Sequence, residues 1–461
     1  MIGSCADFAQ GSLASLPDMG ALGYKRDKLS PNPKGEYMRV LHTSDWHIGA
    51  DLCEKSRLDE HKAFFAWLAN TIREERVDVL LASGDIFDTP SPSNGAVAVY
   101  FDFLRSLHDT PCRHVVITGG NHDSPSHLNA PAGYLAHDGI HILGCAKDGA
   151  IEREVLVLDD EKGAPSLIVC AVPFLRDRDV RKSSFGQNPE ERARELCAGI
   201  DRHYRDVLAR ARERAKSLAH PCPIVGMGHL FASGSSMQDG ETGLTVGTLG
   251  AVDASFAKGF CYMALGHIHT PQRVGSERVR YSGSVLPMSF GEKANKQVVL
   301  LDIEPWSPAM GSEPDQEEWP LAMRLLDVPV FRELFQVEGD AKKIERELRV
   351  LGTTHPGSWV EVNYTGTDPL EGRKERIFAA AEGLDILRVR DLSAPLADKA
   401  AGVDKKLDEY SPKDIFNMCL SANNIEEGQK AVLNTLFDEI VSGLDTLLED
   451  STQETGQGAR A

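Results

Sequence analysis

The sequence lacks any long hydrophobic run. Apolar residues make up 41% of its 461 residues, yet no stretch approaches the about 20 consecutive apolar residues that a membrane-spanning helix needs. The N-terminus also lacks a basic start followed by an apolar stretch, so it does not resemble a secretory signal. We therefore expect a cytoplasmic protein that contacts no membrane.

Paired cysteines are missing as well. Nine cysteines are scattered along the chain, and no two of them form a C-x-x-C pair. An odd, dispersed set is typical of reduced thiols in a reducing compartment, and it excludes a disulfide-stapled fold. A soft metal held by paired thiolates is not expected either.

The chain has fewer basic than acidic residues: 50 Lys and Arg and 69 Asp and Glu, for a net charge of -19. Such a chain is not expected to coat nucleic acid, since phosphate binding needs Lys and Arg. A nucleic-acid enzyme is still compatible with this charge, because metal ions can supply positive charge locally and a basic groove can lie on an acidic body.

Short apolar runs alternate with helical patterns from Met38 onward, and this alternation predicts a layered α/β domain. The strand-like runs are Arg39–His42, Val77–Ala82, His114–Thr118, Ile140–Leu143, Glu154–Leu158, Ser166–Val172, Ile224–Met227, Tyr262–Leu265, Val279–Tyr281 and Gln297–Asp302. Two amphipathic helices lie between the first strands. Their apolar faces are Phe64, Phe65, Leu68 and Ile72 in one, and Val97, Phe101, Leu104 and Leu107 in the other.

Composition divides the chain into several parts. We expect residues 1–36, rich in Gly, Ala, Ser, Asp and Pro, to be a disordered extension, and Met38 to be the natural start. The layered domain covers residues 37–304, and the proline-rich residues 305–322 predict a linker. Residues 323–400 predict a smaller α+β domain. Its strand-like segments are Met323–Val328, Trp359–Tyr364 and Asp385–Arg390, and its helical segments are Lys342–Leu351 and Arg373–Ala381.

The C-terminal part allows two interpretations. Residues 401–450 are acidic and carry an apolar helical stripe from Val432 to Leu444. This pattern fits a terminal helix packed on its own domain, and it also fits a docking helix for a partner. In the docking interpretation Phe416 and Phe437 are the expected anchors. Residues 451–461 are expected to be a disordered tail.

Five polar clusters each follow a strand candidate directly. They are Asp45-Trp46-His47, Gly84–Asp88, Gly120–Asp123, Gly228-His229 and Gly266–His269. Ligands of open α/β sheets bind outside the carboxyl ends of the strands, so these clusters are expected to converge on one face. A single D-x-H or G-D occurs by chance, but five ordered clusters at strand ends indicate a site.

The types of side chain in these clusters predict a metal centre. Asp45 and His47 are two residues apart, as are His267 and His269, so each pair can point the same way from extended backbone. Carboxylate, imidazole and amide donors without thiolate suit Mn, Fe or Zn. They exceed what one ion uses, and two ions about 3.5–4 Å apart that share a carboxylate fit better. Such pairs are used in phosphoester cleavage.

The ordered motifs D-x-H, G-D-x-x-D, G-N-H-D, G-H and G-H-x-H resemble those of the calcineurin-like metallophosphoesterase superfamily. The sequence around these motifs, as in residues 38–49, 264–272 and 280–292, is similar to that of the SbcD family. Members of this family are the nuclease subunits of bacterial SbcCD complexes. The resemblance is strong over residues 38–303 and looser over 324–400. It implies an α/β fold: a layered metallophosphoesterase β-sandwich flanked by helices, with a smaller α+β capping, DNA-binding domain and a C-terminal helical segment at 401–450 that docks a partner.

The resemblance also implies the ligands of two divalent metal ions, most often Mn²⁺ in such proteins. Asp45, His47 and His269 correspond to the ligands of one ion. Asn121, His229 and His267 correspond to those of the other, and Asp85 to the bridge between them.

Other site residues follow from the same resemblance. His122 is expected to protonate the leaving oxygen or stabilise the transition state, with Asp123 orienting it. Asp88 stands where some relatives carry His, and it is grouped with the catalytic residues. Ser282–Ser284 are expected to line the entrance of the site, and Trp46 to pack rather than react.

The implied activity is that of a DNA nuclease. It combines a 3′–5′ exonuclease on double strands with an endonuclease on single strands and hairpins. It acts with an SbcC-like coiled-coil ATPase in DNA end processing, repair and recombination. We also expect a heterotetramer with the ATPase, built around a homodimer of this nuclease chain. We expect this complex to associate with the nucleoid.

Two alternatives remain to be tested. The first is another phosphoesterase, either a protein phosphatase or a small phosphodiesterase. Protein phosphatases typically read G-D-x-x-D-R-G and G-N-H-E, whereas Thr89-Pro90 and Asp123 stand here. The second is a non-catalytic scaffold on the same fold, which would be expected to have lost a carboxylate or an imidazole. All seven implied ligands and His122 are present.

Overall fold

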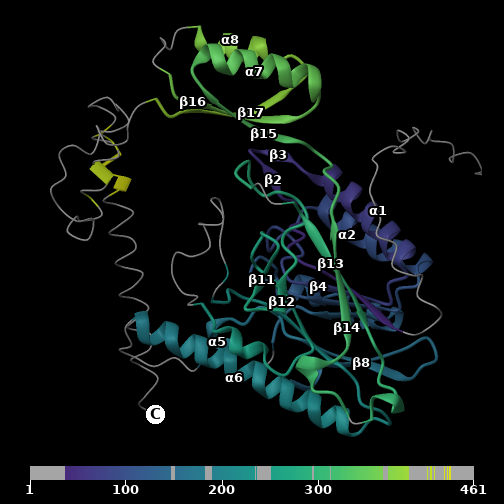
Figure 1. Ribbon diagram of the computed structural model, residues 1–461. Helices are drawn as coiled ribbons and strands as arrows, with labels where there is room; N and C mark the ends of the chain where they lie inside the picture. Colours follow the sequence, from purple (N-terminus) through teal and green to yellow (C-terminus); the bar gives the residue numbers. More distant parts are fainter. Residues whose placement is uncertain are drawn as a thin grey trace, which may run out of the picture. The chain divides into compact units, whose positions relative to one another are not determined.

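The computed structural model describes residues 37–146, 151–181, 189–233, 235, 251–292, 295–311, 313–366 and 372–393, with separate residues between 413 and 437. The predicted extension 1–36, most of 401–450 and the tail 451–461 lie outside the described residues. The chain divides into two compact units, Met1–Phe331 and Arg332–Ala461 (Figure 1).

Two six-stranded sheets form the first unit. Their strand orders are β14-β13-β1-β4-β5-β6 and β11-β12-β10-β9-β8-β7. The strands of the first sheet are β1 (Met38–Thr43), β4 (Val79–Ser83), β5 (His114–Thr118), β6 (Ile140–Leu143), β13 (Gln297–Ile303) and β14 (Leu321–Asp327). Those of the second are β7 (Val155–Asp159), β8 (Pro165–Ala171), β9 (Ile224–His229), β10 (Tyr262–Gly266), β11 (Gln272–Val274) and β12 (Ser276–Tyr281). A short hairpin, β2 (Asp51–Leu52) and β3 (Lys55–Ser56), stands apart.

Parallel pairing dominates the middle of both sheets. Strands β1, β4, β5 and β6 run parallel to one another, as do β8, β9, β10 and β12. Parallel neighbours need crossover connections, and the helices of the unit lie in those connections. The carboxyl ends of neighbouring parallel strands therefore meet at the same edge of each sheet.

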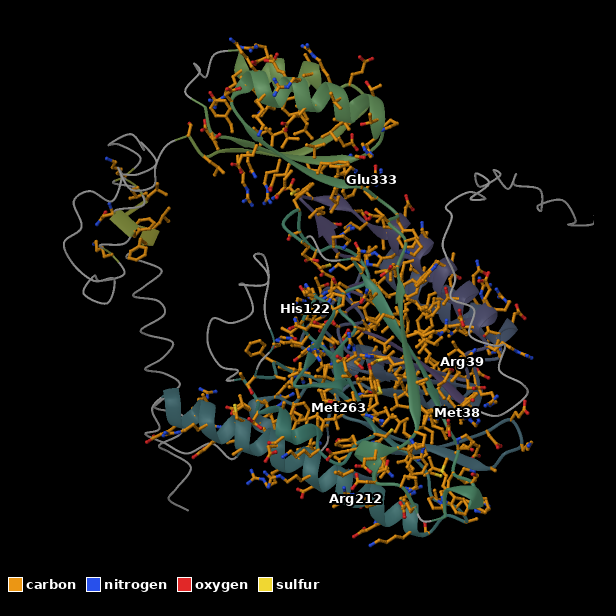
Figure 2. The ribbon with its side chains drawn as sticks, viewed as in Figure 1. Met38, Arg39, His122, Arg212, Met263 and Glu333 are labelled. Carbon is orange, nitrogen blue, oxygen red and sulfur yellow. The ribbon has the colours of Figure 1, made fainter. Side chains whose placement is uncertain are left out.

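Apolar side chains of the strands alternate between the two faces of each sheet. Residues such as Val40, Leu81, Val169 and Met227 fill the space between the sheets, together with Met38 (Figure 2). The outer face of the first sheet packs on α1 (Leu58–Glu75) and α2 (Asn94–Ser106), and that of the second packs on α6 (Pro189–Lys216). The layers thus run helix, sheet, sheet, helix, which confirms the predicted fold class. The short helices of this unit are α3 (Pro125–Asn129), α4 (Ala132–Leu135) and α5 (Asp177–Val180).

The two predicted amphipathic helices differ in how well their faces were predicted. In α1 the four predicted residues are all buried. In α2 the buried stripe runs through Ala96, Val99, Tyr100, Phe103 and Leu104, while Phe101 is 40% exposed. Phe101 follows Tyr100 by one residue, a step of about 100° around a helix, and so it points away from the stripe. The predicted place of Phe101 in the core is wrong.

The predicted boundary between the domains differs from the structure. Residues 305–322 were expected to be a linker, but Trp319 is fully buried in the core between the sheets, and Gln316 accepts a hydrogen bond from the backbone of Ile224 (2.7 Å). The strand predicted at Met323–Val328 is β14, which pairs with β13 over seven residues. The first unit therefore continues to Phe331, because this strand extends its sheet.

The second unit is a three-stranded parallel sheet with two helices. Its elements are β15 (Leu334–Gly339), α7 (Ala341–Thr354), β16 (Trp359–Tyr364), α8 (Arg373–Ala380) and β17 (Asp385–Asp391), and β16 is the central strand. Both helices pack on one face, where Val337, Ile344 and Val360 share a core. Its first strand, β15, was not predicted. In the described part of the chain no helix is both long enough and apolar enough to cross a bilayer.

Candidate metal centre

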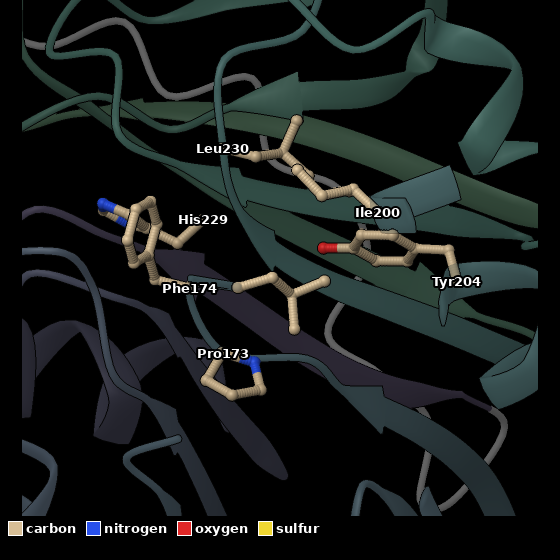
Figure 3. A pocket seen from close by; sticks show the side chains of 7 residues that line it. Pro173, Phe174, Ile200, Tyr204, His229 and Leu230 are labelled. Atoms are coloured by element: carbon tan, nitrogen blue, oxygen red, sulfur yellow. The ribbon is translucent and has the colours of Figure 1, made fainter. Parts of the chain in front are cut away.

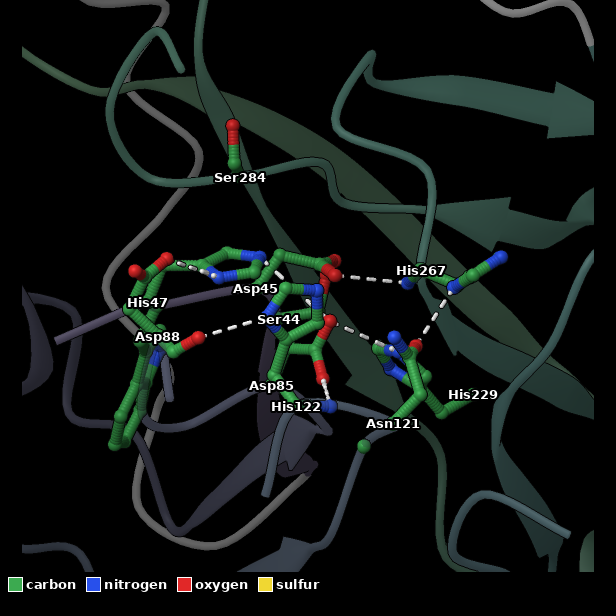
Figure 4. Close-up of polar contacts among 12 residues, drawn as sticks. Ser44, Asp45, His47, Asp85, Asp88, Asn121, His122, His229, His267 and Ser284 are labelled. Atoms are coloured by element: carbon green, nitrogen blue, oxygen red, sulfur yellow. Dashed lines mark hydrogen bonds and ion pairs between the residues drawn. The ribbon is translucent and has the colours of Figure 1, made fainter. Parts of the chain in front are cut away.

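The five polar clusters meet at one edge of the first unit. Asp45 and His47 follow β1, Asp85 and Asp88 follow β4, and Asn121 and His122 follow β5. From the second sheet, His229 ends β9, and His267 and His269 follow β10. Apart from His269, which is not labelled, Figure 4 shows these side chains pointing toward one another from both sheets. The convergence expected at the carboxyl ends of the strands is therefore present.

The backbone at this edge is unusual. Seven non-glycine residues of the described chain have positive φ, and four belong to the clusters: Asp45 (50°), His47 (44°), Asp85 (50°) and His267 (105°). Each such residue costs on the order of 1–3 kcal/mol and persists only where its surroundings hold it. Two backbone hydrogen bonds stabilise these conformations: the N–H of Asp45 donates to the carbonyl of Gly84 (3.0 Å), and the N–H of His47 donates to the carbonyl of Asp85 (2.9 Å). Strain concentrated at one place is typical of a functional site.

Two glycines permit the close approach of the loops. A Cβ at Gly120 would lie 2.1 Å from Oδ1 of Asp85, and one at Gly84 would lie 2.2 Å from Nδ1 of His229. Gly84 also has a φ of +82°. Side chains at either position would push the donor atoms apart, so both glycines serve the geometry of the site.

One group of donors is made by Asp45, His47 and His269. One ligand atom from each lies within 4.8 Å of the others, and all three residues are buried. The carboxylate of Asp45 accepts hydrogen bonds from the backbone of His267 (2.9 Å) and from Oγ of Ser44 (2.5 Å). These bonds fix its orientation and leave lone pairs for a cation, since a carboxylate has about four acceptor sites.

A second group surrounds the amide oxygen of Asn121. Its Oδ1 lies 3.0 Å from Nε2 of His229 and 3.0 Å from Nδ1 of His267. Nδ1 of His229 faces the backbone carbonyl of Ser83 (3.0 Å), which only accepts. A neutral His229 therefore has its one N–H on Nδ1, and its Nε2 lone pair faces the lone pairs of Asn121. With Oδ1 of Asn121 in this place, a cation, either a proton or a metal ion, would satisfy both groups.

Asp85 lies between the two groups. Its Oδ2 is 3.6 Å from Nε2 of His47 and 3.2 Å from Nε2 of His229. Asp85 is 1% exposed, and neither its Oδ2 nor Nε2 of His47 has a hydrogen-bond partner among the described residues. Buried polar atoms are rarely left unsatisfied. The donors thus fit metal ions on both sides of Asp85, and the carboxylate of Asp85 can be shared.

The pKa values reflect this crowding. Burial opposes ionisation of Asp85, but the charge of His229 holds its pKa well below the usual range. Burial likewise opposes protonation of His229, yet Asp85 raises its pKa to about 9. Burial raises the pKa of Asp45 to about 6 and lowers that of His267 to about 3. Without metal, a proton on His229 balances Asp85, so metal binding must release protons.

Sequence comparison connects this geometry with known proteins. The profile of the calcineurin-like phosphoesterases matches residues 38–271. A second profile, described as the type 5 capsule protein repressor C-terminal domain, matches residues 330–424. The SbcD chain of the nuclease SbcCD of Escherichia coli strain K12 is 33% identical over 406 residues, which are 87% of this chain and 97% of that protein.

Two other relatives bear the same name. The SbcD chain of the nuclease SbcCD of Rhodobacter capsulatus is 35% identical over 63% of this chain and 72% of its own length. That of Bacillus subtilis is 31% identical over 60% and 69%, respectively. The chain belongs to the SbcD family of calcineurin-like phosphoesterases. The second profile begins at residue 330, next to the boundary between the two units of this SbcD family member.

The structure changes the role predicted for Asp123 in this SbcD family member. Its carboxylate accepts hydrogen bonds from the backbone of Ile86 (3.1 Å), Phe87 (3.0 Å) and Gly120 (2.8 Å). It therefore joins the loops after β4 and β5. Nδ1 of His122 donates instead to the backbone carbonyl of Asp88 (2.7 Å). The prediction that Asp123 orients His122 by direct contact is wrong, because the Nδ1–H of His122 is already donated to the carbonyl of Asp88.

Ser282 and Ser284 were expected at the entrance of the site, but both are fully buried. Oγ of Ser282 lies 2.8 Å from Oγ of Ser44, next to Asp45. Oγ of Ser284 accepts a hydrogen bond from Nζ of Lys296 (2.8 Å). These serines therefore contact residues that neighbour or hold the donors, Ser44 and Lys296, and do not line the entrance. Trp46 is buried against Phe65 and Phe103, as expected for a packing residue.

Lys296 is a supporting residue that the sequence analysis missed. It is 6% exposed, and its Nζ donates to the backbone carbonyl of His269 (3.0 Å) and to Glu292 (2.5 Å). The bond to the carbonyl holds the loop that carries His269. A lysine directly before the apolar run of β13, with a glutamate four residues earlier, is the signal that could have indicated a buried pair.

An apolar pocket borders the site beside His229. It is lined by Pro173, Phe174, Leu175, Ile200, Tyr204 and Leu230 (Figure 3). The ring of Phe174 meets that of His229 edge to face, with centroids 6.1 Å apart. The backbone N–H of Phe174 donates to the carbonyl of Gly119 (2.8 Å). This bond connects the segment of Phe174, which lines the pocket, with the loop that carries Asn121. Phe174 was not predicted, since the loop after β8 carries no polar cluster.

Proposed function

We propose that this SbcD family member is the nuclease subunit of a complex that hydrolyses phosphodiester bonds in DNA, with two divalent metal ions in the centre described above. The observation that carries the proposal is the position of Asp85 Oδ2, which is buried, lacks a hydrogen bond and faces two histidines. The names of the relatives, all chains of the nuclease SbcCD, support it.

The ligands are assigned from the geometry and the resemblance together. Asp45, His47 and His269 hold one ion. Asn121, His229 and His267 hold the other, and Asp85 is shared. Oxygen and nitrogen donors without thiolate suit Mn, Fe or Zn, and the resemblance to the SbcD family favours Mn²⁺ among them. Bound there, the ions supply a water nucleophile and stabilise negative charge on the phosphate.

His122 acts on the leaving oxygen in this proposal. Its Nδ1–H is engaged by the carbonyl of Asp88, so Nε2 is the atom that can hold and deliver a proton. The ring of His122 lies edge to face with that of His47, 4.9 Å away, which places it beside the first group of donors. General acid catalysis requires a proton donor within reach of the leaving oxygen, and this position supports that role.

The partner is proposed to be an SbcC-like coiled-coil ATPase that docks on residues 401–450. The two expected anchors, Phe416 and Phe437, stack on each other with centroids 4.4 Å apart. They therefore also contribute to packing within the segment. Leu436, 48% exposed, offers apolar surface beside Phe437. Leu436→Asp should weaken co-purification with the ATPase, while Leu436→Met should not.

The assembly and the contact with DNA are proposals too. The homodimer is proposed from the resemblance, and Phe101 (40% exposed) and Tyr134 (79% exposed) on the first unit are apolar side chains that such a contact could cover. The homodimer would sit at the centre of a heterotetramer with two ATPase chains. On the second unit, we expect contact with DNA through residues 332–366 and 372–393, the described part of the capping domain.

The decisive test uses the full chain with its ATPase partner, ATP and Mn²⁺. Linear duplex DNA labelled at its 3′ ends should release the label as short products, and hairpins should be opened. The chain alone should hydrolyse bis-p-nitrophenyl phosphate. Hydrolysis of p-nitrophenyl phosphate only would indicate a phosphatase. Two bound Mn²⁺ per chain without any hydrolysis would indicate a scaffold, and either result would refute the proposal.

A further inference from the structure

Asp88 contacts two histidines of the centre through two different parts of the residue. Its side-chain Oδ1 lies 3.2 Å from Nδ1 of His47, and its backbone carbonyl accepts the Nδ1–H of His122 at 2.7 Å. We propose that Asp88 is a positioning residue that fixes the ring orientation and the N–H tautomer of both histidines. The metal-related part of this inference rests on the proposed function.

The backbone around Asp88 is held firmly enough for this task. The backbone N–H of Ile48 donates to Ile86 (3.0 Å), and that of Asp88 donates to Ile48 (3.3 Å), so the segment runs as a bridge beside the loop of His47. The carboxylate of Asp123 binds the two amides just before Asp88. Asp123 thus acts on both histidines indirectly, by holding the segment that ends in Asp88.

The two contacts have different chemical consequences. A backbone carbonyl can only accept, so the Nδ1 of His122 must carry a proton whatever side chain stands at position 88. The bond to His47 depends on the carboxylate itself. With Nδ1–H directed at Asp88, the Nε2 lone pair of His47 faces Asp85 Oδ2, 3.6 Å away, where a cation can bind. Histidines that bind metal usually donate their second N–H to such a partner.

A purely structural role for Asp88 makes a different prediction. Its side chain is 30% exposed and lies at the rim of the centre, so its removal should cost little packing. If Asp88 only stabilised the loop, both histidines would respond alike to its replacement. If it positions them as inferred, His47 should respond and His122 should not.

The test compares Asp88→Ala with Asp88→Asn, which keeps an acceptor oxygen at the same reach without the charge. Asp102→Ala removes an exposed carboxylate from α2 and serves as the matched control. Nitrogen-15 NMR of metal-free protein labelled at histidine, recorded at a pH high enough for both rings to be neutral, reports the tautomer of each ring, with assignments from His47→Gln and His122→Gln. Equilibrium dialysis with Mn²⁺ reports the two binding steps.

In Asp88→Ala we expect His47 to become a mixture of tautomers and His122 to keep its proton on Nδ1. One Mn²⁺ step should weaken by about 10–100-fold, as is typical when such a partner is lost, and the other should be unchanged. Asp88→Asn should retain the tautomer of His47 and most of the affinity, and the Asp102→Ala control should match the parent.

An unchanged His47 in Asp88→Ala, or an equal change in both histidines, would overturn the inference. Asp88→Asn behaving like Asp88→Ala would do the same, because charge rather than the hydrogen bond would then be responsible. The tautomers are measured without metal or DNA. They can therefore support the positioning role even if the chain proves not to be a nuclease, and an active nuclease with an unaffected His47 would refute the positioning role alone.

Discussion

Asp85 in the first unit and Glu361 in the second are buried to the same extent, each 1% exposed, yet their surroundings differ. Glu361 lies on the central strand β16 and accepts from Gln336 (2.7 Å), Arg388 (2.5 Å) and Arg390, whose Nε is 3.3 Å away. Asp85 faces histidines and keeps one oxygen without a hydrogen bond. A buried carboxylate satisfied by fixed cations has a structural role, whereas one left partly unsatisfied among metal-binding side chains indicates a site.

Replacing Asp85 should have the largest effect on activity. Asp85→Ala removes the carboxylate that both ions are proposed to share. We expect hydrolysis to fall by more than the about 10²–10³-fold that the loss of one donor to a transition state costs. Unfolding by urea should still show a folded protein, because without Asp85 the buried His229 no longer needs to hold the proton that balances this carboxylate. Near-normal nuclease activity in this variant would contradict the shared site.

His122→Ala should lower the hydrolysis rate by about 10²–10⁴-fold, the usual worth of a general acid. The metal content should stay at two ions per chain by elemental analysis, since His122 is not proposed as a ligand. His127→Ala, a nearby histidine outside the donor groups, serves as the control. Loss of metal together with activity would show that His122 is itself a ligand.

Glu361→Ala should reverse the pattern seen for Asp85. The variant removes the acceptor of Arg388 and Arg390, whose side chains are 40% and 47% exposed and can bind water instead, so the loss of stability should be that of ordinary hydrogen bonds, roughly 0.5–1.5 kcal/mol. Hydrolysis of bis-p-nitrophenyl phosphate by the folded protein should be unchanged. Glu361→Gln, which keeps one acceptor oxygen, should lose less stability. If Glu361→Ala lost activity without losing stability, the proposed difference between a structural Glu361 and a metal-binding Asp85 would be wrong.

His42 offers a smaller test of a buried, satisfied group. It bridges the two sheets, with Nδ1 3.0 Å from the hydroxyl of Tyr262 and Nε2 3.2 Å from the carbonyl of Leu265. Burial lowers its pKa to about 3. Below pH about 6.5 the unfolded chain takes up a proton that the folded chain does not, so this contribution to stability falls as the pH decreases toward 3.

The measurement for His42 is urea unfolding between pH 7 and pH 5 in the presence of a chelator. The free energy of unfolding of the parent should fall more steeply than that of His42→Gln, by up to about 1.4 kcal/mol per pH unit. Equal slopes for the two proteins would show that His42 does not provide this dependence.

The strands of the first unit were predicted well because each has an apolar run whose length and ends are set locally. Those predicted before residue 304 are all present, with ends that differ by at most three residues. The strand β14 was predicted too, but in the wrong unit, since its seven pairs with β13 are formed across a connection that looked like a linker. Pairing partners are set by tertiary contacts, which local patterns do not report.

Local sequence patterns were enough to identify the residues at the strand ends, because a polar cluster after an apolar strand is visible within a few positions. Which of these residues are donors was implied by the resemblance to the SbcD family, namely Asp45, His47, Asp85, Asn121, His229, His267 and His269. How those donors are supported became visible only in the folded chain. Asp88 rather than Asp123 contacts His122, Ser282 contacts Ser44 beside Asp45, and Lys296 holds the loop of His269. Such contacts join atoms far apart in the chain, and their geometry depends on the packing of two sheets and the loops between them.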